Sequence, residues 1–264
     1  METTVRTSTG SIRYRVDGPP TAPAILLSNS LGTTLEMWDP QADAWVRTWR
    51  VIRYDTRGHG GSTVVPGEYT IDDLGRDALA VLDAAGAKTA HVCGISLGGL
   101  TAMWLGVNAP DRVSSLIVAN TAARIGTVQR WNERIEKVQH EGMGAIADMV
   151  MGTWFTDVFR KREPAVIERF HRMVASCSAD GYIACSAALR DADLRDAVCR
   201  IRARTLVVAG EYDQSTPKAN SEDIHTRITG STLTTFPCAH LSNVECAADF
   251  TSRASVFYNE AATR

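Results

Sequence analysis

A glycine-flanked segment carries the residue best suited to covalent chemistry. Gly94-Ile-Ser-Leu-Gly-Gly99 matches the pattern G-x-S-x-G, with an apolar run ending at Cys93 before it and an apolar helical run after it. A sharp strand-to-helix turn needs glycines two residues before and after the serine, because side chains there would collide. The hydroxyl then lies at a helix N-terminus, where developing negative charge is stabilised. We predict that Ser96 is a nucleophile; the alternative is a tight turn whose serine only caps the helix.

Two further residues follow this serine at places suited to an acid and a base. Where such an elbow occurs, the acid follows a later strand and the histidine follows the last strand. Asp213 comes just after the strand-like run 205–210, with Glu211 as the competing carboxylate. Of the six histidines, only His240 lies just beyond the last strand-like run, 231–236. We predict that His240 is the general base and that Asp213 orients it.

Two backbone amides are candidates for holding the oxyanion that a serine attack creates. The Leu97 amide directly follows the serine. The second amide is expected in the loop 28–33, Ser-Asn-Ser-Leu-Gly-Thr, which follows an apolar run. Many serine hydrolases have His-Gly in this loop, and aligning Asn29-Ser30 with that pair makes Leu31 the donor. The alternative is a plain loop rich in turn residues.

The segment 53–60, Arg-Tyr-Asp-Thr-Arg-Gly-His-Gly, combines residue types that also occur in phosphate and metal sites. We favour a loop brace beneath the active site, because the glycines suit tightly turned backbone. In that interpretation Arg57 pairs with Asp55.

Short apolar runs bounded by Gly, Pro, Asn or Asp predict the strands that position these residues. They occur at 24–27, 51–52, 91–93, 113–119 and 205–209. Helical spacing predicts helices at 71–85 and 97–108, and alternation around Thr9-Gly10 predicts an opening hairpin. Strands alternating with helices predict an α/β fold with a doubly wound, mostly parallel sheet.

The pattern changes after Asn120. From residue 121 to 199 no convincing strand occurs, only candidate helices at 127–140, 143–151 and 164–175. We therefore predict a core of residues 1–120 and 201–264, and a helical cap of residues 121–200 over the C-terminal edge of the sheet.

Composition limits the partners. The chain has 264 residues, 44% hydrophobic content and a formal net charge of −2, so nothing favours nucleic acid or an anionic membrane as partner. No apolar run reaches the roughly 18–20 residues of a membrane span, and the N-terminus lacks the features of a signal peptide. The six cysteines show no CxxC spacing and read as reduced thiols of a cytoplasmic protein, without a metal role. The oligomeric state stays open.

The motifs together resemble the α/β-hydrolase superfamily over essentially the whole chain. More narrowly, the sequence resembles the 3-oxoadipate enol-lactonases of aromatic degradation. The segments that carry this resemblance are 27–32, 37–41, 53–60, 120–126, 141–143, 154–156 and 240–245. Segments 120–126 and 240–245 discriminate best, because other hydrolases vary there. Two departures are Leu97, where methionine is expected, and Cys238-Ala239 before the histidine.

The resemblance implies an activity: hydrolysis of 3-oxoadipate enol-lactone to 3-oxoadipate in the β-ketoadipate pathway. The partner would be this small anionic lactone, attacked by Ser96 to form an acyl-enzyme, with no metal and no organic cofactor.

The free carboxylate of such a substrate needs a cation. Arg124 is the first candidate, followed by Arg134 and Lys137, although each also fits a solvated cap charge. Apolar parts of the substrate would contact cap aromatics, namely Trp131, Trp154 and Phe155. Aromatic packing within the cap is the alternative for these three.

Two other functions fit the same catalytic residues. One is a general carboxylesterase or an esterase with perhydrolase side activity, since the triad does not select the substrate. The other is a hydrolase-fold receptor that binds a small molecule and signals through a partner protein. A strong preference for neutral acyl esters over the anionic enol-lactone would favour the esterase, and slow turnover with ligand-dependent recruitment of a partner protein would favour the receptor.

Overall fold

Eight strands form one sheet in the order β1-β2-β4-β3-β5-β6-β7-β8. The computed structural model describes residues 2–262. The strands are β1 (Glu2–Arg6), β2 (Ser11–Asp17), β3 (Ala24–Ser28), β4 (Arg50–Tyr54), β5 (Ala90–Ile95), β6 (Val113–Ala119), β7 (Thr205–Gly210) and β8 (Thr232–Phe236). β1 pairs with β2, and β2 with β4, antiparallel, and the other pairs are parallel. The mostly parallel sheet and the opening hairpin are thereby confirmed.

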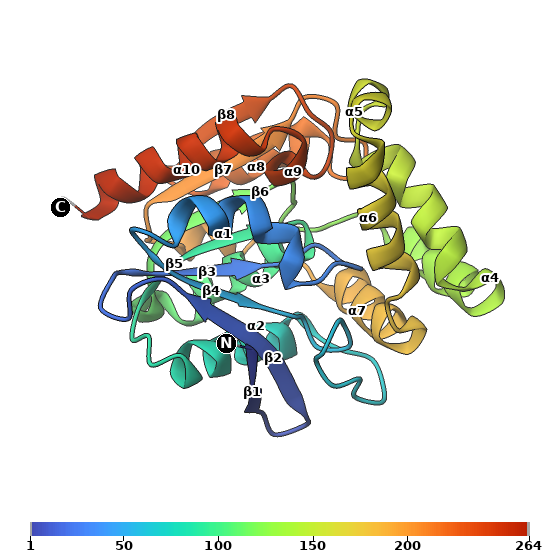
Figure 1. The fold of residues 1–264 in the computed structure, drawn as a ribbon, viewed down its shortest axis with the longest axis horizontal. Helices are drawn as coiled ribbons and strands as arrows, with labels where there is room; N and C mark the ends of the chain where they lie inside the picture. Colours follow the sequence, from blue (N-terminus) through green and yellow to red (C-terminus); the bar gives the residue numbers. More distant parts are fainter. Residues whose placement is uncertain (1, 263–264) are drawn as a thin grey trace.

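The central strands are apolar along their length because helices cover both faces of the sheet. Every residue of β3, β5 and β7 is buried, as expected for a doubly covered parallel sheet. The helices packed on it are α1 (Asp39–Trp45), α2 (Ile71–Ala84), α3 (Leu97–Asn108), α8 (Lys218–Arg227), α9 (Ser242–Glu245) and α10 (Ala247–Ala262). Helix α1 packs with α10 on one face, and α2 packs with α3 on the other (Figure 1).

Local signals fix where these helices begin and end. Thr70 caps α2: its hydroxyl accepts from the Asp73 amide at 3.2 Å, and the Asp73 carboxylate accepts from the Thr70 amide at 2.9 Å. Gly86, with φ of 66°, ends the same helix in a left-handed conformation. Three short 3-10 turns, η1 (Leu35–Trp38), η2 (Pro110–Arg112) and η3 (Val198–Arg200), complete the elements.

The segment between β6 and β7 is helical, as the absence of strand patterns predicts. Its helices are α4 (Val128–Trp154), α5 (Asp157–Arg162), α6 (Pro164–Ala175) and α7 (Ala179–Asp191). Gly142, with φ of 75°, breaks α4 into two parts, which correspond to the separate helices predicted at 127–140 and 143–151. The four helices gather at the end toward which the parallel strands point (Figure 1). The division into core and cap remains our prediction.

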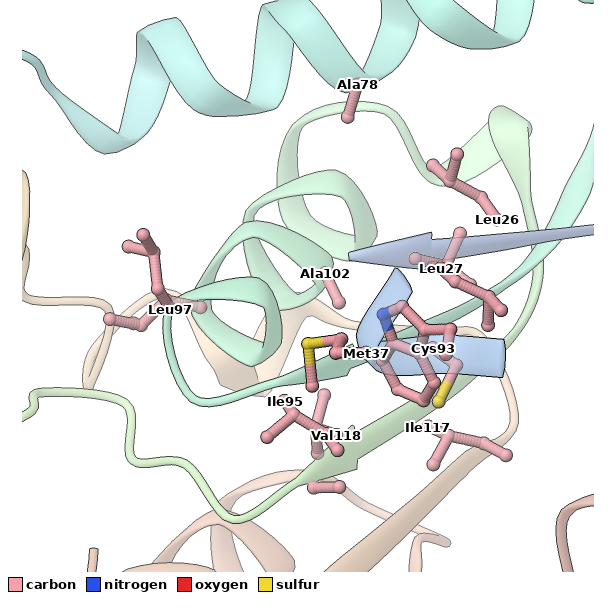
Figure 2. Close-up of a cluster of buried hydrophobic side chains, with 14 of the residues drawn as sticks. Leu26, Leu27, Met37, Ala78, Cys93, Ile95, Leu97, Ala102, Ile117 and Val118 are labelled. Carbon is pink, nitrogen blue, oxygen red and sulfur yellow. The ribbon is translucent and has the colours of Figure 1, made fainter. Parts of the chain in front are cut away.

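The hydrophobic core lies between the sheet and the helices that cover it. Figure 2 shows side chains of β3, β5 and β6 meeting Ala102 of α3 in one apolar cluster. Leu26, Leu27 and Ile117 in that cluster are fully buried. Burying one such side chain contributes about 1.5–3 kcal/mol, so this cluster stabilises the strands that end beside the site.

Candidate active site

The Ser96 elbow joins β5 to α3 in a strained conformation. Ser96 has φ of 57° and ψ of −116°, a region that residues with a side chain occupy only under constraint. A Cβ on Gly94 would lie 2.0 Å from the Gly98 carbonyl oxygen, and one on Gly98 would lie 2.1 Å from the Ser28 oxygen. Only glycine fits at both places, which is the physical reason for the G-x-S-x-G pattern.

His240 and Asp213 form a buried hydrogen-bonded pair. His240 Nδ1 lies 2.9 Å from Asp213 Oδ2 and 3.1 Å from Oδ1. The same carboxylate accepts from the amides of Ser215 and Thr216, at 2.8 and 2.9 Å, and from the Thr216 hydroxyl. Burial alone would raise the pKa of Asp213, but the charge and hydrogen bond of His240 and the bonds from Thr216 bring it below its ordinary value. Asp213 is therefore suited to remain ionised beside the imidazole.

Glu211, the competing carboxylate, lies away from the imidazole. It pairs with Lys218 at 3.2 Å on the surface, and its amide donates to the Phe236 carbonyl. The geometry therefore favours Asp213 as the acid.

Asn120 is a site residue that the sequence analysis did not assign. It is fully buried at the end of β6, with φ of 46°. Its side-chain amide nitrogen donates to Asp213 Oδ2 and to the Ala239 carbonyl, both at 3.1 Å. Its side-chain oxygen, Oδ1, accepts from the Ser242 hydroxyl at 2.5 Å. Asn120 thus ties the acid to the loop that carries His240.

The backbone amides of Leu31 and Leu97 are the predicted oxyanion donors. Within residues 2–262 neither N–H has a hydrogen-bond acceptor from the protein. Leu31 lines the same cavity as Ser96, and Leu97 is the first residue of α3. Asn29 holds the Leu31 loop in place, because its side-chain amide nitrogen donates to the Tyr54 carbonyl at 2.8 Å.

The segment 53–60 braces this loop, but through different pairs than predicted. Arg57 binds Asp77 of α2, with Nε to Oδ2 at 2.6 Å and Nη2 to Oδ1 at 2.9 Å. The predicted pairing of Arg57 with Asp55 is wrong, since Asp55 binds Arg13 at 2.9 Å. His59 provides the brace itself: its Nε2 accepts from the Gly32 amide at 2.9 Å.

A small, partly open cavity of about 40 Å³ connects these groups. Ser96 and His240 lie in its wall, together with Trp131, Trp154 and Arg134 from the predicted substrate contacts. Arg130, which was not among the predicted substrate contacts, also lines the cavity. Arg134 Nη1 donates to the Tyr182 hydroxyl at 2.9 Å.

Arg130 and Arg134 place two positive charges together at the cavity. Burial and the neighbouring charge of Arg134 lower the pKa of Arg130. Arg134 also lies over the Trp131 ring, with 5.9 Å from its guanidinium carbon to the ring centroid. The cavity wall therefore combines an aromatic face with excess positive charge.

Three predicted substrate contacts lie elsewhere. Arg124 lines a separate cavity and pairs with Asp193 at 3.3 Å, so the structure does not bring it to Ser96. Lys137 pairs with Glu141 one helical turn away. Phe155 packs against Phe159 and Phe170. A local ion pair satisfies each cation, and aromatic packing accounts for the phenylalanine.

Other predicted features concern residues outside the cavity. No cluster of three or more His, Cys, Asp or Glu able to hold a metal ion occurs within residues 2–262. All six cysteines are free thiols. Over the same range, no helix has the length and apolar character needed to traverse a bilayer.

The sequence and the fold of this chain are similar to those of known hydrolases. Residues 23–246 match the family model of the alpha/beta hydrolase fold. The chain is 42% identical, over 89% of its length and 88% of the relative's, to 3-oxoadipate enol-lactonase 2 of Acinetobacter baylyi. It superposes with a TM-score of 0.96 on the enol-lactonase from Burkholderia xenovorans LB400, which is 37% identical, covering 97% of this chain and all of that one.

A second solved structure gives the same result. A hydrolase from Pseudomonas aeruginosa PA01 superposes with a TM-score of 0.94 at 43% identity, covering 97% of this chain and 98% of that chain. The chain belongs to the α/β-hydrolase fold family, as a hydrolase of esters or lactones.

Proposed function

We propose that this protein hydrolyses 3-oxoadipate enol-lactone, a small anionic enol ester, to 3-oxoadipate in aromatic-compound degradation. The observation that carries the proposal is the cavity wall, which combines Ser96 and His240 with the guanidinium groups of Arg130 and Arg134. A neutral ester gains nothing from two positive charges, whereas a substrate carboxylate gains charge-assisted hydrogen bonds. The similarity to the Acinetobacter baylyi enol-lactonase supports the same substrate.

In the first half-reaction, Ser96 attacks the lactone carbonyl while His240 takes its proton. Asp213 fixes the imidazole tautomer and stabilises the imidazolium. The Leu31 and Leu97 amides donate to the oxyanion of the tetrahedral intermediate. Collapse of the intermediate breaks the ring C–O bond, and the imidazolium protonates the departing oxygen. The resulting enol then tautomerises to the ketone.

In the second half-reaction, water cleaves the acyl-enzyme. His240 takes a proton from the water as it attacks the ester carbonyl, and the same two amides hold the second oxyanion. The imidazolium then returns its proton to Ser96, which releases 3-oxoadipate. Every proton of the two acyl-transfer steps moves through His240.

Arg134, with Arg130 beside it, takes the role of substrate cation in place of Arg124. Losing one hydrogen bond to a charged group costs about 1.5–3 kcal/mol. Arg134→Gln is therefore expected to lower kcat/KM for the enol-lactone between about 10- and 100-fold. The matched control Arg124→Gln, at the surface pair with Asp193, is expected to keep wild-type kinetics.

The assay follows the ultraviolet absorbance of freshly generated enol-lactone, beside a neutral aryl acetate, with Ser96→Ala as the blank. The wild type should strongly prefer the lactone, and Arg134→Gln should lose that preference while keeping aryl acetate hydrolysis. A wild type that prefers neutral esters would support the carboxylesterase alternative instead. Lactone loss no faster than the blank would refute the proposed substrate.

A further inference from the structure

The loop that carries His240 is held mainly by groups outside its own strand. The His240 and Leu241 amides both donate to the Trp154 carbonyl, at 3.1 and 3.3 Å. Trp154 is the last residue of α4, so two consecutive amides of the loop bind the helical segment between β6 and β7. The preceding amide, of Ala239, donates to the Glu245 carboxylate at 3.0 Å.

Glu245 connects this loop to the same helical segment. Besides the Ala239 amide, its carboxylate accepts from the Thr156 amide, at 3.3 Å to each oxygen, and from the Thr156 hydroxyl. Thr156 caps α5, since its hydroxyl also accepts from the Phe159 amide at 3.2 Å. A carboxylate only accepts hydrogen bonds, and these partners of Glu245 are all donors.

The small size of the cavity at Ser96 explains why such a connection matters. The cavity measures only about 40 Å³. Small-molecule sites usually measure roughly 300–1,000 Å³. The end of α4, with Thr153 and Trp154 in the cavity wall, must therefore move when substrate enters.

We propose that Glu245 is a positioning residue that couples the turn 154–156 to His240. The carboxylate grips Thr156 on one side and the Ala239 amide on the other, so His240 reaches its place beside Ser96 only when the turn has closed over the substrate. The inference rests on the proposed role of His240 as base. It does not depend on which ester is the substrate.

Glu245→Gln tests the coupling. The glutamine NH₂ must face at least one of the N–H donors that the carboxylate now accepts from, so the connection breaks at little change in volume. We expect kcat to fall between about 10- and 100-fold, as for a slightly misplaced catalytic group. KM should stay within about two-fold, because Glu245 does not line the cavity. Glu222→Gln, an exposed residue of α8, is the matched control.

Thr156 supplies a second, milder test. Thr156→Val keeps the side-chain shape but removes the hydroxyl donor to Glu245, and it should lower kcat in the same way, whereas Thr156→Ser should restore it. If the two residues act through one connection, the double variant Glu245→Gln/Thr156→Val should be no slower than Glu245→Gln alone. Additive losses, or variants that lower Tm at unchanged kcat, would overturn the proposal.

Aryl acetate hydrolysis is measured in parallel to separate this inference from the substrate assignment. A wild type that cleaves aryl acetate but not the lactone refutes the proposed substrate and leaves the Glu245 test intact. If the folded variants Thr156→Val and Glu245→Gln each hydrolyse aryl acetate with the wild-type kcat, the coupling is refuted and the substrate assignment is unaffected.

Discussion

At the scale of single residues, Asn120 meets two requirements that few side chains combine. The backbone at the end of β6 needs a φ of 46°, which asparagine tolerates better than most residues. The side chain must also supply two donors, one to the Asp213 carboxylate and one to the Ala239 carbonyl. Glycine would satisfy the backbone alone, and aspartate would place an acceptor against two acceptors.

Asn120→Asp should shift the pH profile. The hydrogen bond from Asn120 helps to hold the pKa of Asp213 below its ordinary value, whereas a second carboxylate there would raise that pKa, so a higher pH is needed to keep Asp213 ionised. We expect the acid limb of kcat/KM to move upward by about one pH unit. The measurement is kcat/KM on aryl acetate from pH 5 to 9.

Asn120→Gly is the control for this shift. It keeps the backbone conformation and removes the amide, so kcat should fall while the acid limb stays nearly in place. An unshifted acid limb in Asn120→Asp would show that the carboxylate environment does not depend on Asn120.

The order of Ser96, Asp213 and His240 along the chain could be predicted because each follows a recognisable strand. The substrate cations could not be ranked as reliably, because the surface partner of Arg124, Asp193, lies far along the chain. A usable signal did exist: Arg130 is four residues before Arg134, which places both on one face of α4.

At the scale of elements, the loop 28–33 depends on the segment 53–60. Neutral His59 accepts from the Gly32 amide, next to the Leu31 amide that would bind the oxyanion. Burial lowers the pKa of His59 to about 4, so the ring stays an acceptor at neutral pH. The glycine pattern predicted a brace here. It did not identify Asp77 as the partner of Arg57, because that contact depends on how α2 packs.

His59→Ala should therefore slow acylation without weakening binding. Complete loss of one oxyanion donor lowers kcat by about 10²–10³-fold. A loop that only loosens should lower the acylation rate by about 10-fold or more. Single-turnover acyl-enzyme formation from aryl acetate measures this step directly. His59→Gln, whose amide oxygen can accept from Gly32, should retain more activity.

His171→Ala serves as the comparison for His59→Ala. His171 lies on α6 and contacts Asp148 at 2.9 Å at the surface, so its loss should leave acylation unchanged. Equal acylation rates in His59→Ala and His171→Ala would contradict the brace.

At the scale of the whole molecule, two buried histidines make stability depend on pH. Burial lowers the pKa of both His59 and His91 to about 4, against about 6.5 in an unfolded chain. His91 contacts Trp49 and Tyr258, and its Nδ1 lies 2.7 Å from the Ser115 hydroxyl. Each ring is neutral in the folded state at pH values where the unfolded chain is already protonated.

Proton uptake by the unfolded chain decides whether the free energy of unfolding rises or falls with pH. Between pH 6.5 and 4 the unfolded state binds more protons, so the free energy of unfolding falls as pH falls, by up to about 1.4 kcal/mol per pH unit for each histidine. Burial raises the pKa of Asp55 and Asp77, which acts in the opposite direction. A single-site comparison is therefore needed to isolate one histidine.

His91→Gln isolates that contribution, because glutamine keeps a polar partner for Ser115 and does not titrate. Urea denaturation at pH 7.5, 6.5, 5.5 and 4.5 should give a wild-type unfolding free energy that decreases more steeply with acid than that of the variant. The two curves should converge by about 2.5 kcal/mol over this range, because part of the roughly 3.4 kcal/mol that separates pKa values of 6.5 and 4 is lost only below pH 4.5. Parallel curves would mean that His91 takes up its proton equally in both states, and that the fold places no penalty on charging it.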